Sequence, residues 1–140
     1  MAVNTYDPGS VSVIWGAIPV VGFASGAMVT VEWNQPQANL HMGTKGEASR
    51  AVVRDKSGRI TIRTSATSSA NDLLDIQAAL DELTGAGALP VAVIDASGTS
   101  LYFGDAAWLS QRPTREFGDS VAELEWVLEV AQLIGHHGSN

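Results

Sequence analysis

Few side chains in this sequence have the types and spacing that catalysis or metal binding requires. Its histidines are His41, His136 and His137. None of them has a companion at the spacing of metal ligands, and the absence of cysteine excludes disulfides, thiolate metal sites and thiol nucleophiles. No serine lies in a G-x-S-x-G turn, and Gly43 and Gly46 lack the sequence context of a phosphate-binding loop. We therefore expect no catalytic residue, no metal and no cofactor.

Paired acids and tryptophans are the remaining candidates for a site. Glu123 and Glu125 are two positions apart, which on a strand gives a charged face rather than the carboxylate pair of a glycosidase. Trp33 and Trp126 fall on apolar faces and are expected in the core. The other two tryptophans, Trp15 and Trp108, stand at strand ends, in the core or in an interface. A carbohydrate- or ligand-binding β-sandwich that uses them is an alternative function, and an enzyme is the weakest interpretation.

Charge is distributed unevenly over the 140 residues, a length that suits one domain with a sizeable core. The net charge is −7, yet six of the eight basic residues lie between positions 45 and 63. A basic segment on an acidic body suits nucleic-acid binding or self-association, and the acidic remainder argues against the first because it repels DNA. The sequence shows no signal peptide and no apolar run of membrane-spanning length, so we expect a soluble intracellular protein without a membrane partner.

Alternating apolar and polar residues predict a mostly β protein. Strands are expected at about 10–15, 17–23, 27–34, 37–42, 59–67, 91–95, 100–108 and 122–133. Helical spacing fits the last of these almost as well, but tryptophan and valine favour a strand there. Residues 1–9 are expected to form an extended arm, 43–59 a long basic loop and 135–140 a frayed tail.

One helix is predicted over residues 70–84. Leucine and isoleucine recur there at helical spacing, which indicates an amphipathic helix with this face on the core: Leu73, Ile76, Leu80 and Leu83. Ser69 or Asn71 can cap its start, and Gly85 follows its end. Its acids are expected to point outward. Together the elements predict one domain of 140 residues, a β-sandwich or a partly closed β-barrel with a single α-helix.

The order of these elements resembles the tail tube proteins of contractile-tailed bacteriophages. The resemblance spans residues 3–82 and rests on Asp7-Pro8-Gly9, Gly22-Phe23-Ala24, Asp55-x-Ser57-Gly58 before Ile60-Thr61-Ile62, and Ser69-x-Asn71-Asp72-x-Leu74. Beyond it the chain resembles the family only in being rich in strands. The resemblance implies six-fold rings that stack head to tail into a hollow tube, inside a contractile sheath, through which DNA passes during infection.

The resemblance also implies partners and a location. The partners are further copies of the chain, a tail sheath protein, tube initiator and terminator proteins, and DNA in transient passage. The location is the virion tail, assembled in the host cytoplasm. The first hypothesis is therefore the major structural subunit of a tail tube, without enzymatic activity. The alternative within the same fold is a ring-forming tube initiator or terminator.

Three sets of residues acquire expected roles from this resemblance. Basic residues of the 43–59 segment would contact an adjacent ring: Lys45, Arg50, Arg54, Lys56 and Arg59. Polar sides of the strands would line the lumen, the central channel of the tube: Thr30, Glu32, Asn39, His41, Thr61, Glu123, Glu125 and Glu129. Acids of the helix would face the sheath: Asp72, Asp75, Asp81 and Glu82. Arg63 lies on the same side of its strand as Thr61. Its positive charge is unexpected in a lining that repels DNA, unless it pairs with a nearby acid.

Overall fold

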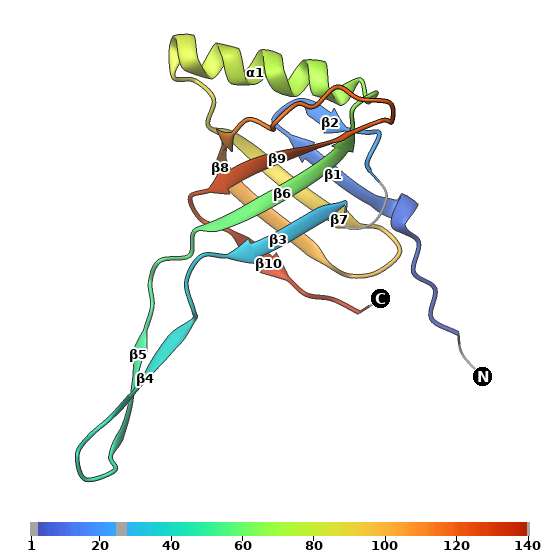
Figure 1. The fold of residues 1–140 in the computed structure, drawn as a ribbon. Helices are drawn as coiled ribbons and strands as arrows, with labels where there is room; N and C mark the ends of the chain where they lie inside the picture. Colours follow the sequence, from blue (N-terminus) through green and yellow to red (C-terminus); the bar gives the residue numbers. More distant parts are fainter. Residues whose placement is uncertain (1–2, 25–27, 140) are drawn as a thin grey trace.

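The computed structural model describes residues 3–24 and 28–139. Its elements are a 3-10 helix at Pro8–Ser10, β1 (Val11–Trp15), β2 (Ile18–Val20), β3 (Val29–Trp33), β4 (Ala38–Met42), β5 (Ala48–Val52), β6 (Gly58–Ser65), α1 (Ala70–Thr84), β7 (Leu89–Asp95), β8 (Leu101–Gln111), β9 (Glu123–Val130) and β10 (Ile134–His136) (Figure 1). The prediction of a mostly β protein with one α-helix is confirmed. Residues 1–2 of the expected arm, residues 25–27, which include the start of the expected 27–34 strand, and residue 140 lie outside the described residues.

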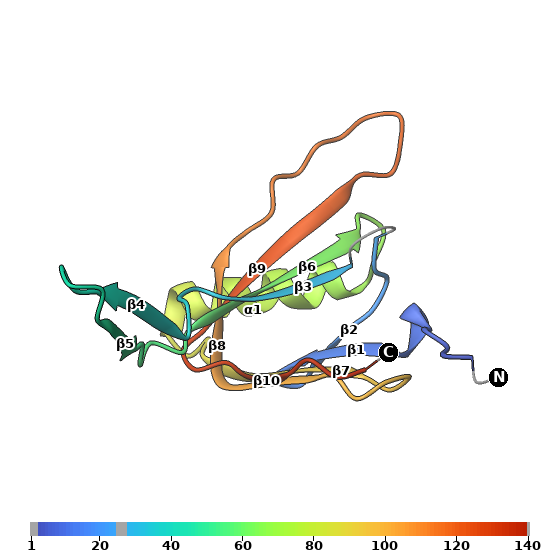
Figure 2. The same cartoon turned by 90° about the horizontal axis from the view of Figure 1, so that it is seen from below.

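One antiparallel sheet folds over on itself to make two layers. Its strand order is β2-β1-β7-β8-β9-β6-β3, with β10 also paired to β8. The long strand β8 belongs to both layers, because its first half pairs with β7 and β10 and its second half with β9 (Figure 2). Gly104 lies between these halves, where a Cβ would collide with Val130. No pairing joins β3 to β2 or β10 among the described strands, so the sheet does not close into a barrel.

The core lies between the two layers and follows the predicted alternation. On β6, Ile60 and Ile62 are fully buried. On β9, every second residue from Leu124 to Val130 is buried, so this element is a strand and the prediction made for it is confirmed. Trp126 lies in this core, whereas Trp33 is only partly buried against it. Trp15 is also fully buried and donates its indole N–H to the Ala107 carbonyl at 2.9 Å.

Helix α1 covers one end of the two layers (Figure 1). The face that it turns inward differs from the one expected. Its buried side consists of small or polar residues with a single leucine: Ala70, Asn71, Leu74 and Ala78. Asn71 does not cap the helix; it accepts hydrogen bonds from Thr64 at 2.6 Å and from the Trp126 indole at 3.2 Å. Because these bonds fix the helix rotation, the predicted inward stripe lies on the outside. All four of its members are exposed: Leu73, Ile76, Leu80 and Leu83.

The prediction of a long basic loop at 43–59 is wrong for Ala48–Val52, which form strand β5. Strands β4 and β5 pair from Ala38↔Val52 to Met42↔Ala48 and form a hairpin that projects from the two layers (Figures 1 and 2). A short turn closes the hairpin, with Gly46 at a φ of 86°, a conformation that glycine adopts without strain. The turn brings residues 48–52 back beside 38–42, although 48–52 read Ala-Ser-Arg-Ala-Val and show no clear alternation of apolar and polar residues.

The C-terminal segment is also more ordered than the frayed tail that was predicted. Strand β10 pairs with the first half of β8, from Ile134↔Phe103 to His136↔Leu101. Beyond it, the Ser139 N–H donates to the Thr99 hydroxyl at 3.0 Å. Burial of Leu133 just before β10 holds this segment on the core, which the polar sequence after it does not reveal.

Candidate functional site

The outer surface of β3, β6 and β9 brings together most of the polar side chains that were predicted to line a lumen. Alternation turns Ile60 and Ile62 inward, so their neighbours on β6 point away from the core. Pairing with β3 and β9 then places polar residues of three strands in rows. We call this surface the polar face; it consists of Thr30, Glu32, Arg59, Thr61, Arg63, Glu123, Glu125 and Glu129. Six of the eight residues predicted to line a lumen lie here.

Ion pairs cross the polar face from strand to strand. Arg59 lies in one row with Glu32 and Glu129; its Nε is 3.0 Å from a Glu129 oxygen, and one of its terminal nitrogens is 3.8 Å from a Glu32 oxygen. Arg63 pairs with Glu125 at 3.7 Å, which accounts for a cation in this register. Arg59, predicted to contact an adjacent ring, therefore lies in the middle of the polar face. Four carboxylates against two guanidinium groups leave this face acidic.

Replacing Arg59 with glutamine is expected to lower the free energy of unfolding by less than about 1 kcal/mol, because the ion pairs it makes are partly exposed to solvent. The loss should shrink as salt is raised, since salt screens the remaining carboxylates from one another. Chemical denaturation at low and high salt measures both effects. Arg63→Gln, which removes one ion pair, is the matched control and should cost less. A salt-independent loss of several kcal/mol would contradict this assignment.

The other two predicted lumen residues, Asn39 and His41, do not lie on the polar face. They project from one side of the β4–β5 hairpin, opposite Ala51 and Ser49. The remaining residues predicted for ring contact are spread along the same region: Lys45 in the hairpin turn, Arg50 on β5, and Arg54 and Lys56 in the connection to β6. In that connection the Ser57 N–H donates to the Asp55 carboxylate at 3.0 Å and lowers the pKa of Asp55.

The acids of α1 predicted to face a sheath do not form one surface. Asp75 and Glu82 lie 3.8 Å and 3.6 Å from nitrogens of Arg112, which follows β8. Asp81 accepts the Gly87 N–H at 2.9 Å and so belongs to the turn after the helix. Asp72 is exposed in the first turn. Three of the four acids therefore line one flank of α1.

Two open strand edges flank the polar face, and sequence reasoning did not locate either of them. β3 ends the sheet, and hydrogen bonds from Arg63 N–H to the Met28 carbonyl and from Asn34 N–H to the Ser57 carbonyl fix which residues face β6. By alternation, the backbone groups of Val29 and Val31 point away from β6. No described strand pairs with this side of β3.

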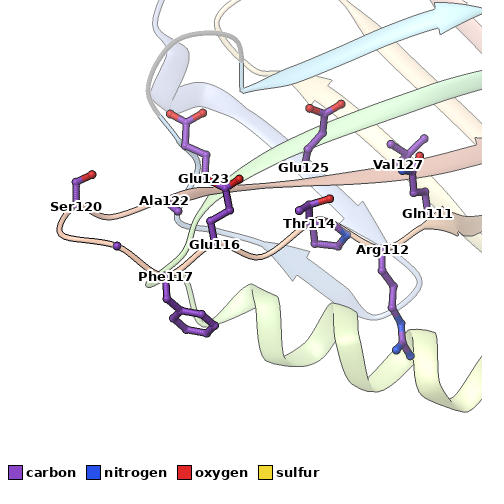
Figure 3. Close-up of a pocket in the computed structure, with 12 residues that line it drawn as sticks. Gln111, Arg112, Thr114, Glu116, Phe117, Ser120, Ala122, Glu123, Glu125 and Val127 are labelled. Carbon is purple, nitrogen blue, oxygen red and sulfur yellow. The ribbon is translucent and has the colours of Figure 1, made fainter.

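The second open edge is the first half of β9. Strand β8 pairs with β9 only from Val127 onward, while the Ala66 N–H donates to the Ala122 carbonyl on the β6 side. The backbone groups of Glu123 and Glu125 therefore point away from β6. Segment 112–122 passes beyond this edge and leaves a hollow of about 710 Å³ beside it, lined in part by Thr114, Glu116 and Glu123 (Figure 3). The proline and charged residues of that segment were the only signal in the sequence that pairing stops here.

The rings of Trp33, Tyr102 and His137 form a cluster between β3, β8 and the segment after β10. Trp33 packs edge-on against His137 at 5.4 Å between ring centroids, and the Trp33 indole donates to the Leu133 carbonyl. The Tyr102 hydroxyl bonds to His137 Nδ1, and burial raises the pKa of Tyr102. Of the two tryptophans in the ligand-binding alternative, Trp15 is fully buried and cannot be an exposed platform, whereas Trp108 on β8 is 38% exposed.

Over residues 3–24 and 28–139, no group of three or more histidine or acidic residues could hold a metal ion. No helix within those residues is long and apolar enough to cross a membrane.

Comparison with known proteins finds a similar phage structural protein and similar folds in contractile injection systems. No family model matches the chain. Structural protein ORF10 of Pseudomonas phage KPP10 is 25% identical over 145 residues, covering 98% of this chain and 84% of that protein. A chain of the PVC sheath–tube complex, from an extracellular contractile injection system in the extended state, superposes with a TM-score of 0.64 at 15% identity, over 94% of this chain and 91% of that one.

Two further solved structures come from the ends of such assemblies. The sheath/tube terminator of the PVC system gives a TM-score of 0.65 at 14% identity, over 98% of this chain and 100% of that one. The tube-terminating cap of the anti-feeding prophage gives 0.65 at 11% identity, over 97% and 94%. The chain therefore has the fold of proteins from contractile injection-system tubes and their terminators.

Proposed function

We propose that this protein is a structural subunit of a contractile-tail tube, which joins further copies of itself into rings that stack into a hollow conduit. One observation carries the proposal above the others. A polar face lies between two open strand edges, on a fold that matches tube and terminator proteins over nearly its whole length. Six copies per ring is the number that the resemblance to phage tail tubes implies.

The two edges provide the contact between neighbours in a ring. An open edge presents unpaired N–H and C=O groups that pair readily with another strand. If β3 of one copy pairs with the first half of β9 of the next, the sheets become continuous and neither edge stays open. Because the edges lie on opposite sides of the polar face, repeating this contact closes a ring, with the polar face on one surface of every copy.

In this arrangement the polar face lines the lumen. Thr30, Thr61 and the glutamates of β3 and β9 then face passing DNA, while Arg59 and Arg63 are engaged by those glutamates. The excess of carboxylates repels phosphate groups, so DNA slides without binding to the wall. Asn39 and His41 lie outside this lining, because the hairpin that carries them leaves the sheet. A sheath protein around the tube is the outer partner that the resemblance implies.

A ring-forming terminator or initiator is the second candidate. It is supported by the terminator and cap structures, whose TM-scores of 0.65 are as high as the 0.64 of the sheath–tube complex to within 0.01. Such a protein would use the same strand edges to form a ring. It would differ in offering no surface on which further rings of itself can stack.

Negative-stain electron microscopy of the purified protein, over a range of concentrations and salt, tests the proposal. A tube subunit should give hollow tubes or stacked rings that lengthen with concentration and shorten at high salt, because charged segments join the rings. Single rings at every concentration would assign the protein to the terminator class instead. Monomers under all conditions, and also after mixing with an initiator ring, would contradict both.

A further inference from the structure

Helix α1 carries an apolar stripe on its outer surface that nothing in the described chain covers. Leu73, Ile76, Leu80 and Leu83 are 45%, 57%, 47% and 83% exposed. Their spacing places them on one side of the helix, roughly opposite the buried side of Ala70, Leu74 and Ala78. Scattered exposed leucines are ordinary, but four aligned on one helix are typical of a binding surface. We call this set the α1 stripe.

The β4–β5 hairpin carries a second uncovered apolar surface. Its register places Leu40 opposite Arg50, Met42 opposite Ala48 and Ala38 opposite Val52, so these six residues share one side. Leu40, Met42 and Val52 are 70%, 60% and 60% exposed. A two-stranded hairpin without a packed face is at best marginally stable in water, so this side gains stability from a partner.

The charges around the two surfaces are complementary. The flank of the α1 stripe carries Asp72, Asp75 and Glu82, with Arg112 pairing the last two. The hairpin carries Arg50 on its apolar side and Lys45 in its turn, and Arg54 follows it. The cations beside the apolar side of the hairpin and the anions beside the α1 stripe attract each other and favour one orientation of contact. Two hairpins, or two helices, would bring like charges together.

The two surfaces lie at opposite ends of the molecule, so one copy cannot bring them together (Figure 1). We propose that the apolar side of the β4–β5 hairpin of one copy packs along the α1 stripe of a second copy, with Arg50 beside the acidic flank. The contact is heterologous: each copy offers its hairpin to one neighbour and its helix to another, so the same contact can be repeated from copy to copy. This inference rests on the proposed function, because it names a second pair of surfaces, besides the strand edges, through which copies of a tube subunit join.

Disulfide trapping between two single-cysteine variants tests the contact, because the native chain has no cysteine. Leu40→Cys and Ile76→Cys are introduced in separate chains, both at exposed positions where the change should not affect folding. After mixing, assembly and mild oxidation, mixed dimers should form in large excess over dimers of either variant alone. Val121→Cys, at an equally exposed position on segment 112–122, is the matched control and should not form a disulfide with Leu40→Cys.

Charge reversal gives a second readout. Arg50→Glu in the Leu40→Cys chain should lower the yield of mixed dimer about tenfold by setting like charges together. Asp72→Arg in the Ile76→Cys chain should restore it. A yield of mixed dimer that is the same with and without these substitutions would overturn the proposed orientation.

The outcomes separate this inference from the proposed function. Tubes or rings that form without the Leu40–Ile76 disulfide would overturn the inference and leave the proposed function standing. Protection of Ile76→Cys from a thiol reagent only after sheath protein is added would assign the α1 stripe to the sheath and also overturn it. Neither assembly nor disulfide at the highest protein concentration would refute both.

Discussion

A Val31→Pro variant is expected to fold and yet to form neither rings nor tubes. The N–H of Val31 lies on the open edge of β3, so proline removes a hydrogen-bond donor that the subunit itself does not use. Proline is tolerated on edge strands when its nitrogen faces outward. A neighbouring copy, however, can no longer pair across that edge. Circular dichroism and thermal unfolding report folding, and electron microscopy with size-exclusion chromatography reports assembly.

Two further variants make this result interpretable. Val31→Thr keeps the N–H and a similar shape, so it should assemble like the native protein. Val29→Pro tests the same edge at the next outward-facing residue and should also give a folded monomer. Normal tubes from both proline variants would show that β3 does not join the copies.

Replacing Asn71 with leucine is expected to have the largest effect on the stability of the subunit, a loss of about 3 kcal/mol. The Asn71 side chain accepts hydrogen bonds from the buried Thr64 hydroxyl and the Trp126 indole, and donates to the Ser65 carbonyl at 2.9 Å. Leucine leaves these groups buried without partners. Urea unfolding, at protein concentrations below those of assembly, measures the change.

Gln77→Ala on the same helix is the control, and it should change the free energy of unfolding by less than about 0.5 kcal/mol. If Asn71→Leu were as stable as the native protein, the rotation of α1 would not depend on this hydrogen-bonded cluster. The α1 stripe should also become less exposed in Asn71→Leu if the helix rolls to bury it.

The element types could largely be predicted from the sequence, but what each element packs against could not. Alternation identified the buried residues of β6 and β9, because one face of each meets the core. The same alternation in 38–42 indicated a strand correctly, yet it could not show that β4 leaves the sheet. Periodicity defines a face, whereas the neighbour of that face depends on contacts distant in sequence.

The rotation of α1 shows the same limit. The spacing of Leu73 and its equivalents has the period of a buried face, and sequence reasoning places leucines inside. The structure turns Asn71 inward instead, because Thr64 and Trp126 offer it partners from β6 and β9. The positions of the open edges could not be predicted for a related reason. An edge is a strand side without a neighbour, and the residues of a strand do not determine which other strands pair with it.

The pairing of β6 with β9 has a consequence for the timing of assembly in the cell. Ile62 pairs with Trp126, so the polar face is completed by a strand that the ribosome makes long after β3 and β6. Bringing such distant segments together is slow compared with forming local contacts. A nascent chain therefore has the β3 edge but lacks both the β9 edge and the completed sheet. If copies join through these two edges as we propose, joining follows synthesis of residues 123–130, and unfinished chains are not incorporated.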